Sequence, residues 1–310
     1  MSTIDVVVRA RWAEAEGVVS VVLARPDGGD LPEWSPGAHI DVVLPEHTRQ
    51  YSLCGSPLRR DEYRIAVLLE QAGRGGSRSV HALQEGDAVG IHLPRNNFPL
   101  DDAKSYLFIA GGIGITPLLP MIEEVASRQG NWKLVYGGRS RGSMAFVDAL
   151  AQREGVVEIH PEDEFGRLDI TGLMEYATTT DSAVYSCGPT GLLDALEISA
   201  AAHGVELHVE RFAAVVASDA VNTPFEVVCA ESGITVAVRD DQSMLDALVN
   251  AGIDMNFKCR EGTCGSCELS VLGGLPDHRD AIIAKADRAT SEVIFPCVSR
   301  SLDRQLILDI

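Results

Sequence analysis

The pattern of hydrophobic and polar positions changes twice along the chain, and the first part reads as a β-structure. Residues 1–101 hold short β-rich runs separated by Gly, Pro and Asp turns. The runs are VVVRARW, GVVSVVLARP, HIDVVL, YRIAVLLE and DAVGIHLP. Such runs predict an antiparallel barrel or sandwich.

The second part, residues 102–214, alternates strand-like and helix-like runs. YLFIAG precedes TPLLPMIEEVASRQ, KLVYGG precedes MAFVDALAQRE, and AVYSCGP precedes GLLDALEISAAAHG. This alternation predicts βαβ units and a parallel sheet. Residues 105–122 are uncharged over roughly the length of a membrane-spanning helix. Their glycines and prolines favour a strand, a tight turn and a helix instead.

The third part begins after a segment that is typical of a linker. Residues 213–224, AAVVASDAVNTP, are small or polar and end in proline, and we place the linker at 215–224. Residues 225–310 then open with FEVVCAES and ITVAVRD, which predict a hairpin, followed by a short helix in SMLDALVNAG. A cysteine-rich loop comes next.

That loop, KCREGTCGSC, has the spacing of a cluster-binding site. Cys259, Cys264 and Cys267 follow C-x4-C-x2-C, and Cys297 lies further along the chain. This is the plant-type [2Fe–2S] ligand pattern, in which glycines let the loop curl so that N–H groups point at the sulfurs. A zinc ribbon needs a second C-x2-C pair, and a redox-active thiol pair should open a helix after a strand. Both alternatives fit less well.

Composition and charge narrow the class of protein. The 310 residues carry a formal net charge of −19, which argues against nucleic-acid binding. The acidic surface favours solubility or the attraction of a basic partner. No signal peptide is visible at the start, and seven cysteines make a disulfide framework improbable, so the cytoplasm is the expected compartment. We expect Cys54 and Cys229 to be buried as small hydrophobic residues.

Two further motifs suggest sites for phosphate-bearing ligands. RQYSL contains Arg49, Tyr51 and Ser52, and GRGGSRSVH follows it with a Gly-Gly-Ser turn that leads into a helix. GGIGITP, residues 111–117, follows an apolar strand and opens a helix, which is the location of a nucleotide-phosphate turn. R-x-Y-S and Gly-Gly-Ser alone are weak signals, because the first is a common strand pattern and the second a common loop, and GGIGITP is not the full G-x-G-x-x-G motif.

In their order along the chain, these motifs resemble a known family. A barrel with R-x-Y-S, then GGIGITP, then a CGP strand end resembles the ferredoxin-NADP reductase superfamily. With a plant-type ferredoxin domain behind it, the chain resembles the phthalate dioxygenase reductase family over essentially its whole length. The resemblance implies a barrel domain that binds FMN rather than FAD, an α/β domain that binds NADH or NADPH, and an α+β ferredoxin domain of the β-grasp type.

The resemblance also implies roles for individual residues. The flavin would bind at the strand and turn described above. Tyr51 would lie against the flavin ring, and Arg49 would point toward the phosphate. The flavin-binding residues would be Arg49, Gln50, Tyr51, Ser52, Gly75, Gly76 and Ser77. The nicotinamide nucleotide would lie against Gly111, Gly112, Gly114, Thr116 and Pro117. Cys187, Gly188 and Pro189 would flank the nicotinamide where hydride leaves it. Glu210 and Phe212 match the stretch that ends the nucleotide domain, and Phe212 would lie over the flavin.

The choice between NADH and NADPH stays open. Arg139, Ser140 and Arg141 follow KLVYGG, where the adenine ribose would lie. An acid there would favour NADH and an arginine can pair with a 2′-phosphate. No acid is present, yet relatives that use NADH also carry arginine at this position.

The resemblance implies a reductase that hands electrons to another protein. Hydride would pass from NAD(P)H to FMN, and single electrons from FMN to the cluster. No acid or base is needed for hydride transfer, so His39, His81 and His278 are interpreted as structural or surface residues. The acceptor would be a Rieske-type aromatic oxygenase or demethylase component, with a cytochrome P450 as the alternative. A redox-sensing or electron-transfer subunit of a larger complex is a further alternative.

Overall fold

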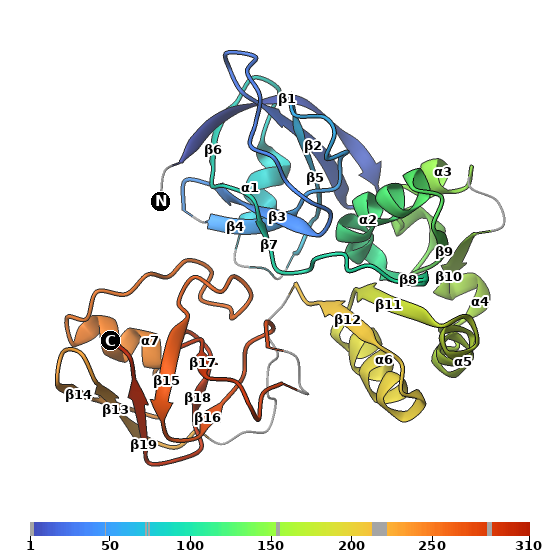
Figure 1. The fold of residues 1–310 in the computed structure, drawn as a ribbon. Helices are drawn as coiled ribbons and strands as arrows, with labels where there is room; N and C mark the ends of the chain where they lie inside the picture. Colours follow the sequence, from blue (N-terminus) through green and yellow to red (C-terminus); the bar gives the residue numbers. More distant parts are fainter. Residues whose placement is uncertain are drawn as a thin grey trace. The chain divides into compact units, whose positions relative to one another are not determined.

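The computed structural model describes residues 3–46, 48–71, 73, 75–152, 156–212, 222–283 and 287–310. The chain divides into two compact units, Met1–Glu210 and Arg211–Ile310 (Figure 1). Each unit is described by itself. No helix among the described residues is long and apolar enough to cross a membrane.

The first unit begins with the predicted antiparallel β-barrel. Its sheet has the order β4-β3-β6-β1-β2-β5, and β7 pairs with β3. The strands are β1 (Ile4–Ala15), β2 (Val18–Ala24), β3 (Ala38–Val43), β4 (Thr48–Ser52), β5 (Tyr63–Leu68), β6 (Ala88–Ile91) and β7 (Arg95–Asn96). Helix α1 (Gly76–Ala82) follows β5. Side chains that alternate inward along these strands, such as Val19, Val21 and Leu23 of β2, form the barrel core.

The second half of this unit is the predicted parallel sheet, in the order β10-β9-β8-β11-β12. Its strands are β8 (Ser105–Gly111), β9 (Asn131–Gly138), β10 (Val157–Pro161), β11 (Ser182–Cys187) and β12 (Leu207–Glu210). The helical elements are η1 (Gly112–Gly114), α2 (Ile115–Ser127), η2 (Arg141–Ser143), α3 (Val147–Leu150), α4 (Glu162–Phe165), α5 (Ile170–Thr180) and α6 (Thr190–His203). Residues 105–122 are thus strand, turn and helix, as expected.

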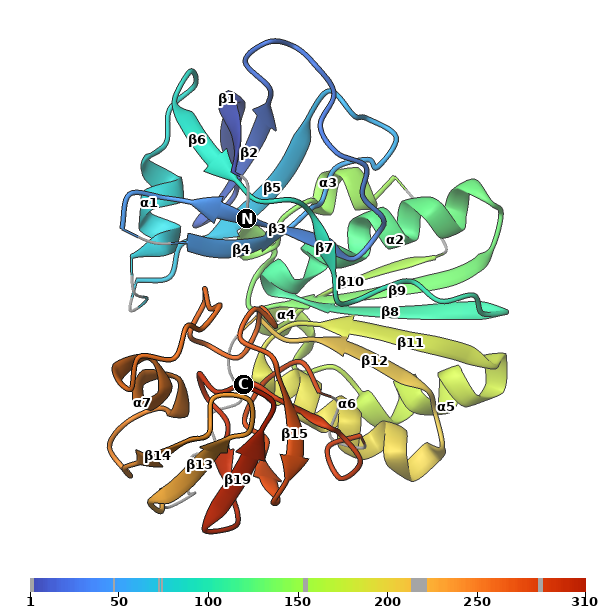
Figure 2. The same cartoon turned by 60° about the vertical axis from the view of Figure 1, so that its left-hand side comes forward.

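Successive side chains of strand β8 pack on opposite faces of the parallel sheet. Tyr106 and Phe108 pack on the face that α2 covers, whereas Leu107 and Ile109 pack on the face that α5 and α6 cover (Figure 2). Helix α3 begins later than MAFVDALAQRE predicts, because Phe146 before its first residue takes a left-handed backbone conformation with φ 63°.

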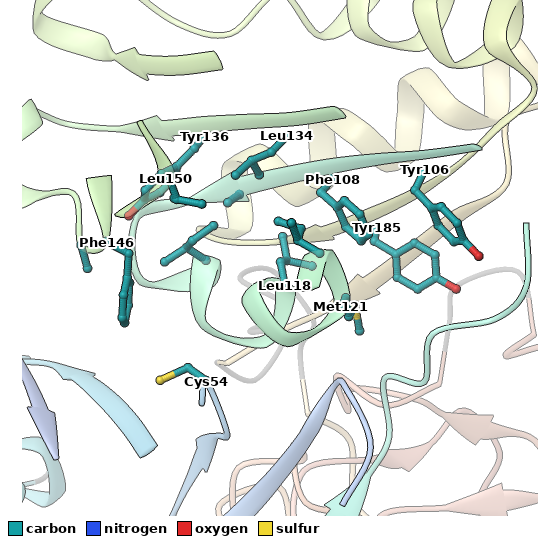
Figure 3. Close-up of a cluster of buried hydrophobic side chains, with 14 of the residues drawn as sticks. Cys54, Tyr106, Phe108, Leu118, Met121, Leu134, Tyr136, Phe146, Leu150 and Tyr185 are labelled. Carbon is teal, nitrogen blue, oxygen red and sulfur yellow. The ribbon is translucent and has the colours of Figure 1, made fainter. Parts of the chain in front are cut away.

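The barrel and the parallel sheet share one hydrophobic cluster. Val18, Cys54 and Ala66 of the barrel belong to the same cluster as Leu118 and Met121 of α2. Figure 3 shows Cys54 on the barrel side of this helix. The predicted boundary between residues 101 and 102 falls between two sheets of one compact unit, and that division stays a prediction.

The second unit contains the predicted hairpin, β13 (Phe225–Cys229) and β14 (Ile234–Val238), within a sheet of order β14-β13-β19-β15-β17. The remaining elements are α7 (Met244–Asn250), β15 (Leu269–Gly273), β16 (Pro276–Asp277), β17 (Val293–Ile294), β18 (Arg300–Ser301) and β19 (Gln305–Leu308). Ser243 caps α7 by accepting a hydrogen bond from the Asp246 N–H. Cys229 is buried, as expected.

The predicted linker falls mainly outside the described residues, which resume at 222. Residues 222–224, the last of the predicted linker, form hydrogen bonds with the second unit. Arg300 donates to the carbonyl of Thr223 at 3.1 Å, and Arg279 donates to the Asn222 side chain at 2.7 Å. Residues 222–224 therefore belong structurally to the unit that they precede.

Candidate functional site

The predicted flavin-phosphate site brings Arg49 against the start of α1. A Cβ added at Gly76 would lie 2.5 Å from Arg49 Cγ and 3.0 Å from Arg49 Nε, so only glycine allows this approach. Gly75 precedes the helix with φ 93°, and no side chain caps the helix. The Ser77 hydroxyl is used elsewhere, because its Oγ accepts a hydrogen bond from the Glu70 N–H at 3.0 Å. A helix start without a side-chain cap, next to the Arg49 guanidinium, fits an anionic phosphate.

Strand β4 distributes its other predicted residues between two faces. Tyr51 packs partly against the barrel core, and burial raises its pKa to about 12. Gln50 points to the opposite face, as alternation along a strand requires, and its Nε2 lies 3.0 Å from His39 Nε2. A flavin contact for Gln50 stays a prediction.

Three predicted residues from distant parts of the sequence meet at one point. Cys187 and Glu210 are register partners on the parallel strands β11 and β12. The Ser52 hydroxyl donates to Glu210 Oε2 at 3.4 Å and so links β4 to this pair. The barrel and the parallel sheet therefore form one site.

Burial raises the pKa of both Glu210 and Cys187. Desolvation raises the pKa of Glu210 to about 8, against the lowering effect of the Ser52 hydrogen bond. Burial, and next the Glu210 carboxylate, raise the pKa of the Cys187 thiol well above its ordinary value. Removal from water thus favours the protonated form of both groups.

The GGIGITP turn lies directly against the CGP strand end. A Cβ at Gly114 would be 2.2 Å from the Cys187 carbonyl oxygen, and one at Gly111 would be 2.6 Å from Pro189 Cδ. Gly112 adopts φ 55° with open space around it. The glycines thus let the two predicted halves of the nucleotide site touch.

The two residues that follow the turn have internal roles in this structure. Thr116 is buried and donates its hydroxyl to the Ile113 carbonyl at 3.0 Å. Pro117 is buried in the first turn of α2. Both shape the turn, and their contact with a nucleotide stays a prediction, as does that of Gly188.

At the end of β9, the structure supplies an acidic group that sequence reasoning missed. Arg139, Ser140 and Arg141 lie beside α4, whose residues include Glu162, Asp163 and Glu164. The Asp163 N–H donates to the Arg139 carbonyl at 3.2 Å, and Arg141 Nε is 3.6 Å from Glu164 Oε1. The pairing of β9 with β10 produces this contact. An acidic run directly after a strand was the available signal.

The four predicted cluster ligands come together in the second unit. Cys259, Cys264, Cys267 and Cys297 are each at least nine-tenths buried. The thiols of Cys264 and Cys297 form hydrogen bonds that lower the pKa of Cys259, and a hydrogen bond from Cys297 lowers that of Cys267.

The contacts between the four thiols form a chain, in which Cys264 interacts with Cys259, Cys259 with Cys297, and Cys297 with Cys267. Four buried thiols with the plant-type spacing are the ligands that two bridged irons need. A buried thiolate set of this kind is suited to [2Fe–2S] binding.

Phe212 is the last described residue before the gap at 213–221, with 43% of its surface exposed. It falls in the second compact unit, so its predicted place over the flavin stays a prediction.

Known proteins are similar to this chain in both of its compact units. Residues 227–301 match the 2Fe-2S iron-sulfur cluster binding domain. Vanillate O-demethylase oxidoreductase of Pseudomonas sp. (strain HR199 / DSM 7063) is 37% identical over 318 residues, which cover 99% of this chain and 100% of that protein.

Two solved structures are similar over almost the whole chain. Phthalate dioxygenase reductase, described as a modular structure for electron transfer from pyridine nucleotides to [2Fe–2S], has 34% identity and a TM-score of 0.73, covering 100% of this chain and 98% of that one. An intact type IV self-sufficient cytochrome P450 monooxygenase has 42% identity and a TM-score of 0.87 over 99% of this chain. This chain spans only 41% of that longer protein. The chain belongs to the phthalate dioxygenase reductase family, and it is an oxidoreductase that carries electrons from NAD(P)H through FMN to a [2Fe–2S] cluster.

Proposed function

We propose that this chain is the reductase component of a two-protein oxygenase, and that it supplies single electrons to a Rieske-type aromatic oxygenase or demethylase. The observation that supports this proposal is that one chain holds both kinds of site. The first unit contains the Ser52–Glu210–Cys187 site, and the second unit contains four buried cysteines. When bound, FMN takes up two electrons as hydride and gives them up one at a time. The likeness to vanillate O-demethylase oxidoreductase supports this class of acceptor.

Electron order is tested by separating the two cofactors. Wild-type protein should reduce both ferricyanide and cytochrome c with NADH or NADPH. Cys264→Ser should abolish cytochrome c reduction but keep ferricyanide reduction, because only the former needs the cluster. Cys229→Ala, a buried cysteine outside the ligand set, is the control and should keep both activities. Equal loss of both activities in Cys264→Ser would contradict the proposed order.

A cytochrome P450 is the second candidate acceptor. The 42% identity to part of a self-sufficient P450 monooxygenase favours it. Product formation should be measured with a purified Rieske oxygenase and with a purified P450, each mixed with this reductase. Turnover with the P450 alone would replace the first proposal with the second.

For the nucleotide, we infer a preference for NADH. Glu164 partly neutralises Arg141, and Asp163 adds negative charge beside the predicted ribose site, whereas Glu162 is paired with Arg167 at 3.5 Å. These acids would repel the 2′-phosphate of NADPH, and a carboxylate can accept a hydrogen bond from a ribose hydroxyl. A higher kcat/KM for NADPH than for NADH would refute this inference.

A further inference from the structure

Two side-chain hydroxyls of the cluster loop contact ligand sulfurs: that of Thr263 interacts with Cys259, and that of Ser266 with Cys264. Ser266 Oγ lies 2.9 Å from Cys264 Sγ, and the Ser266 N–H donates to the same sulfur at 3.4 Å. The sulfur of Cys259 receives the backbone N–H of Glu261 at 3.3 Å. Cys264 therefore takes two donors from a single residue, one of them a side chain that substitution can remove.

The direction of this hydrogen bond follows from the chemistry of the ligand. A cysteine bound to iron is a thiolate without a proton, so it can only accept, and the Ser266 hydroxyl must donate. Backbone geometry holds the hydroxyl in place, because Gly265 adopts φ 72° and turns the chain back toward Cys264.

The surroundings strengthen the interaction. Cys264 keeps only 4% of its surface exposed. A Cβ at Gly265 would lie 3.7 Å from Ile282 and 3.9 Å from Phe295, so apolar side chains cover the loop on that side. A hydrogen bond to a charged sulfur is stronger in such a low-dielectric site than in water.

We propose that the Ser266 hydroxyl raises the reduction potential of the cluster. The reduced cluster carries one more negative charge than the oxidised cluster, so its sulfur ligands accept a hydrogen bond more strongly. Donation from Ser266 stabilises the reduced form more than the oxidised form and makes the cluster a better acceptor of electrons from the flavin. Ser266 thereby acts on the cluster through Cys264, as a positioning residue. The inference deepens the proposed function, because the same cluster is the exit of the electron path.

The test is a redox titration of the full-length holoprotein, followed by the EPR signal of the reduced cluster. Ser266→Ala should lower the equilibrium constant for one-electron reduction by about tenfold, which corresponds to 59 mV. Ser266→Thr keeps a hydroxyl and should titrate near the wild type. Ser270→Ala removes an exposed hydroxyl from β15 in the same unit and should leave the potential unchanged.

Two results would overturn the proposal. One is an Ala variant with full iron and sulfide content that titrates at the wild-type potential, and the other is a Thr variant that shifts as far as the Ala variant. If the Ala variant fails to assemble its cluster, the Thr variant is compared with Ser266→Val, which has the same shape without the hydroxyl. Equal potentials in that pair would also overturn it. Loss of cytochrome c reduction in the wild type would refute the proposed function, but it would not alter these differences in potential.

Discussion

The contact between the GGIGITP turn and the CGP strand end can be broken by one methyl group. In Gly114→Ala, the new Cβ would lie 2.2 Å from the Cys187 carbonyl oxygen and 2.6 Å from the Gly188 nitrogen. These distances are about 1.2 Å and 0.8 Å short of an ordinary 3.4 Å contact. Both neighbours are backbone atoms, so the strain cannot be relieved by a side-chain rotation, and β8 and β11 must separate at their carboxyl ends.

The consequences should appear in stability and in rate. Overpacking of this kind costs about 1–3 kcal/mol, and each kcal/mol lowers the unfolding temperature of a unit of this size by about 2–4 °C. A displacement of about 1 Å in a site that aligns reacting groups costs about 100-fold in rate. We therefore expect flavin reduction by saturating NADH, measured by stopped-flow absorbance, to slow by about 100-fold.

Gly191→Ala is the matched control. Its Cβ meets nothing within 4 Å, and it lies in the first turn of α6, close to the same strand end. This variant should reduce its flavin at the wild-type rate and gain about 0.5–1 kcal/mol from helix propensity. A Gly114→Ala protein with wild-type flavin reduction and an unchanged unfolding temperature would refute the reasoning.

Three further predictions concern charged groups. The pKa of Glu210 is raised by burial to about 8 from 4.5, so its contribution to stability is complete below pH 4.5 and is lost as the pH rises through 8. Glu210→Gln should therefore flatten the fall in the free energy of unfolding between pH 5 and 9, measured with urea. Glu164→Gln frees Arg141 and should raise the ratio of kcat/KM for NADPH to that for NADH several-fold. Arg300→Met removes the donor from three backbone carbonyls, each worth about 1–3 kcal/mol, and should lower the unfolding temperature of the second unit, followed by visible circular dichroism of the cluster.

Each of these variants has a control of the same type. Glu206→Gln, Glu175→Gln and Arg304→Met change exposed side chains and should match the wild type in the respective assays. A pH profile of Glu210→Gln parallel to that of the wild type would contradict the assignment of the raised pKa. An unchanged nucleotide ratio in Glu164→Gln would show that the ion pair does not govern selectivity. Equal unfolding temperatures for Arg300→Met and Arg304→Met would contradict the buried role of Arg300.

Patterns confined to short segments were sufficient to predict most elements. Alternation predicted the β13–β14 hairpin, and glycines and prolines within residues 105–122 correctly excluded a spanning helix. The cysteine spacing likewise identified four residues that the structure buries together. In each case the local backbone chemistry agrees with the tertiary contacts, so the sequence signal is not overridden.

What escaped prediction depends on pairings between distant segments. The acids of α4 reach Arg141 because β10 pairs with β9, and nothing in KLVYGG reveals that neighbour. The later start of α3 rests on the left-handed conformation of Phe146, which propensity disfavours for an aromatic residue. Similarly, the hydrogen bond from Ser266 to Cys264 depends on the path of a folded loop.

The hydrophobic cluster that joins the barrel to α2 limits how this chain can be recombined. The second unit has a hydrophobic cluster built from its own residues, among them Phe225, Leu245 and Leu308. A ferredoxin unit exchanged between relatives would therefore carry this core with it. A barrel exchanged without its nucleotide sheet would leave Val18, Cys54 and Ala66 facing a foreign helix. We therefore expect the flavin and nucleotide domains to stay together in natural gene fusions, and designed chimeras should keep them together as well.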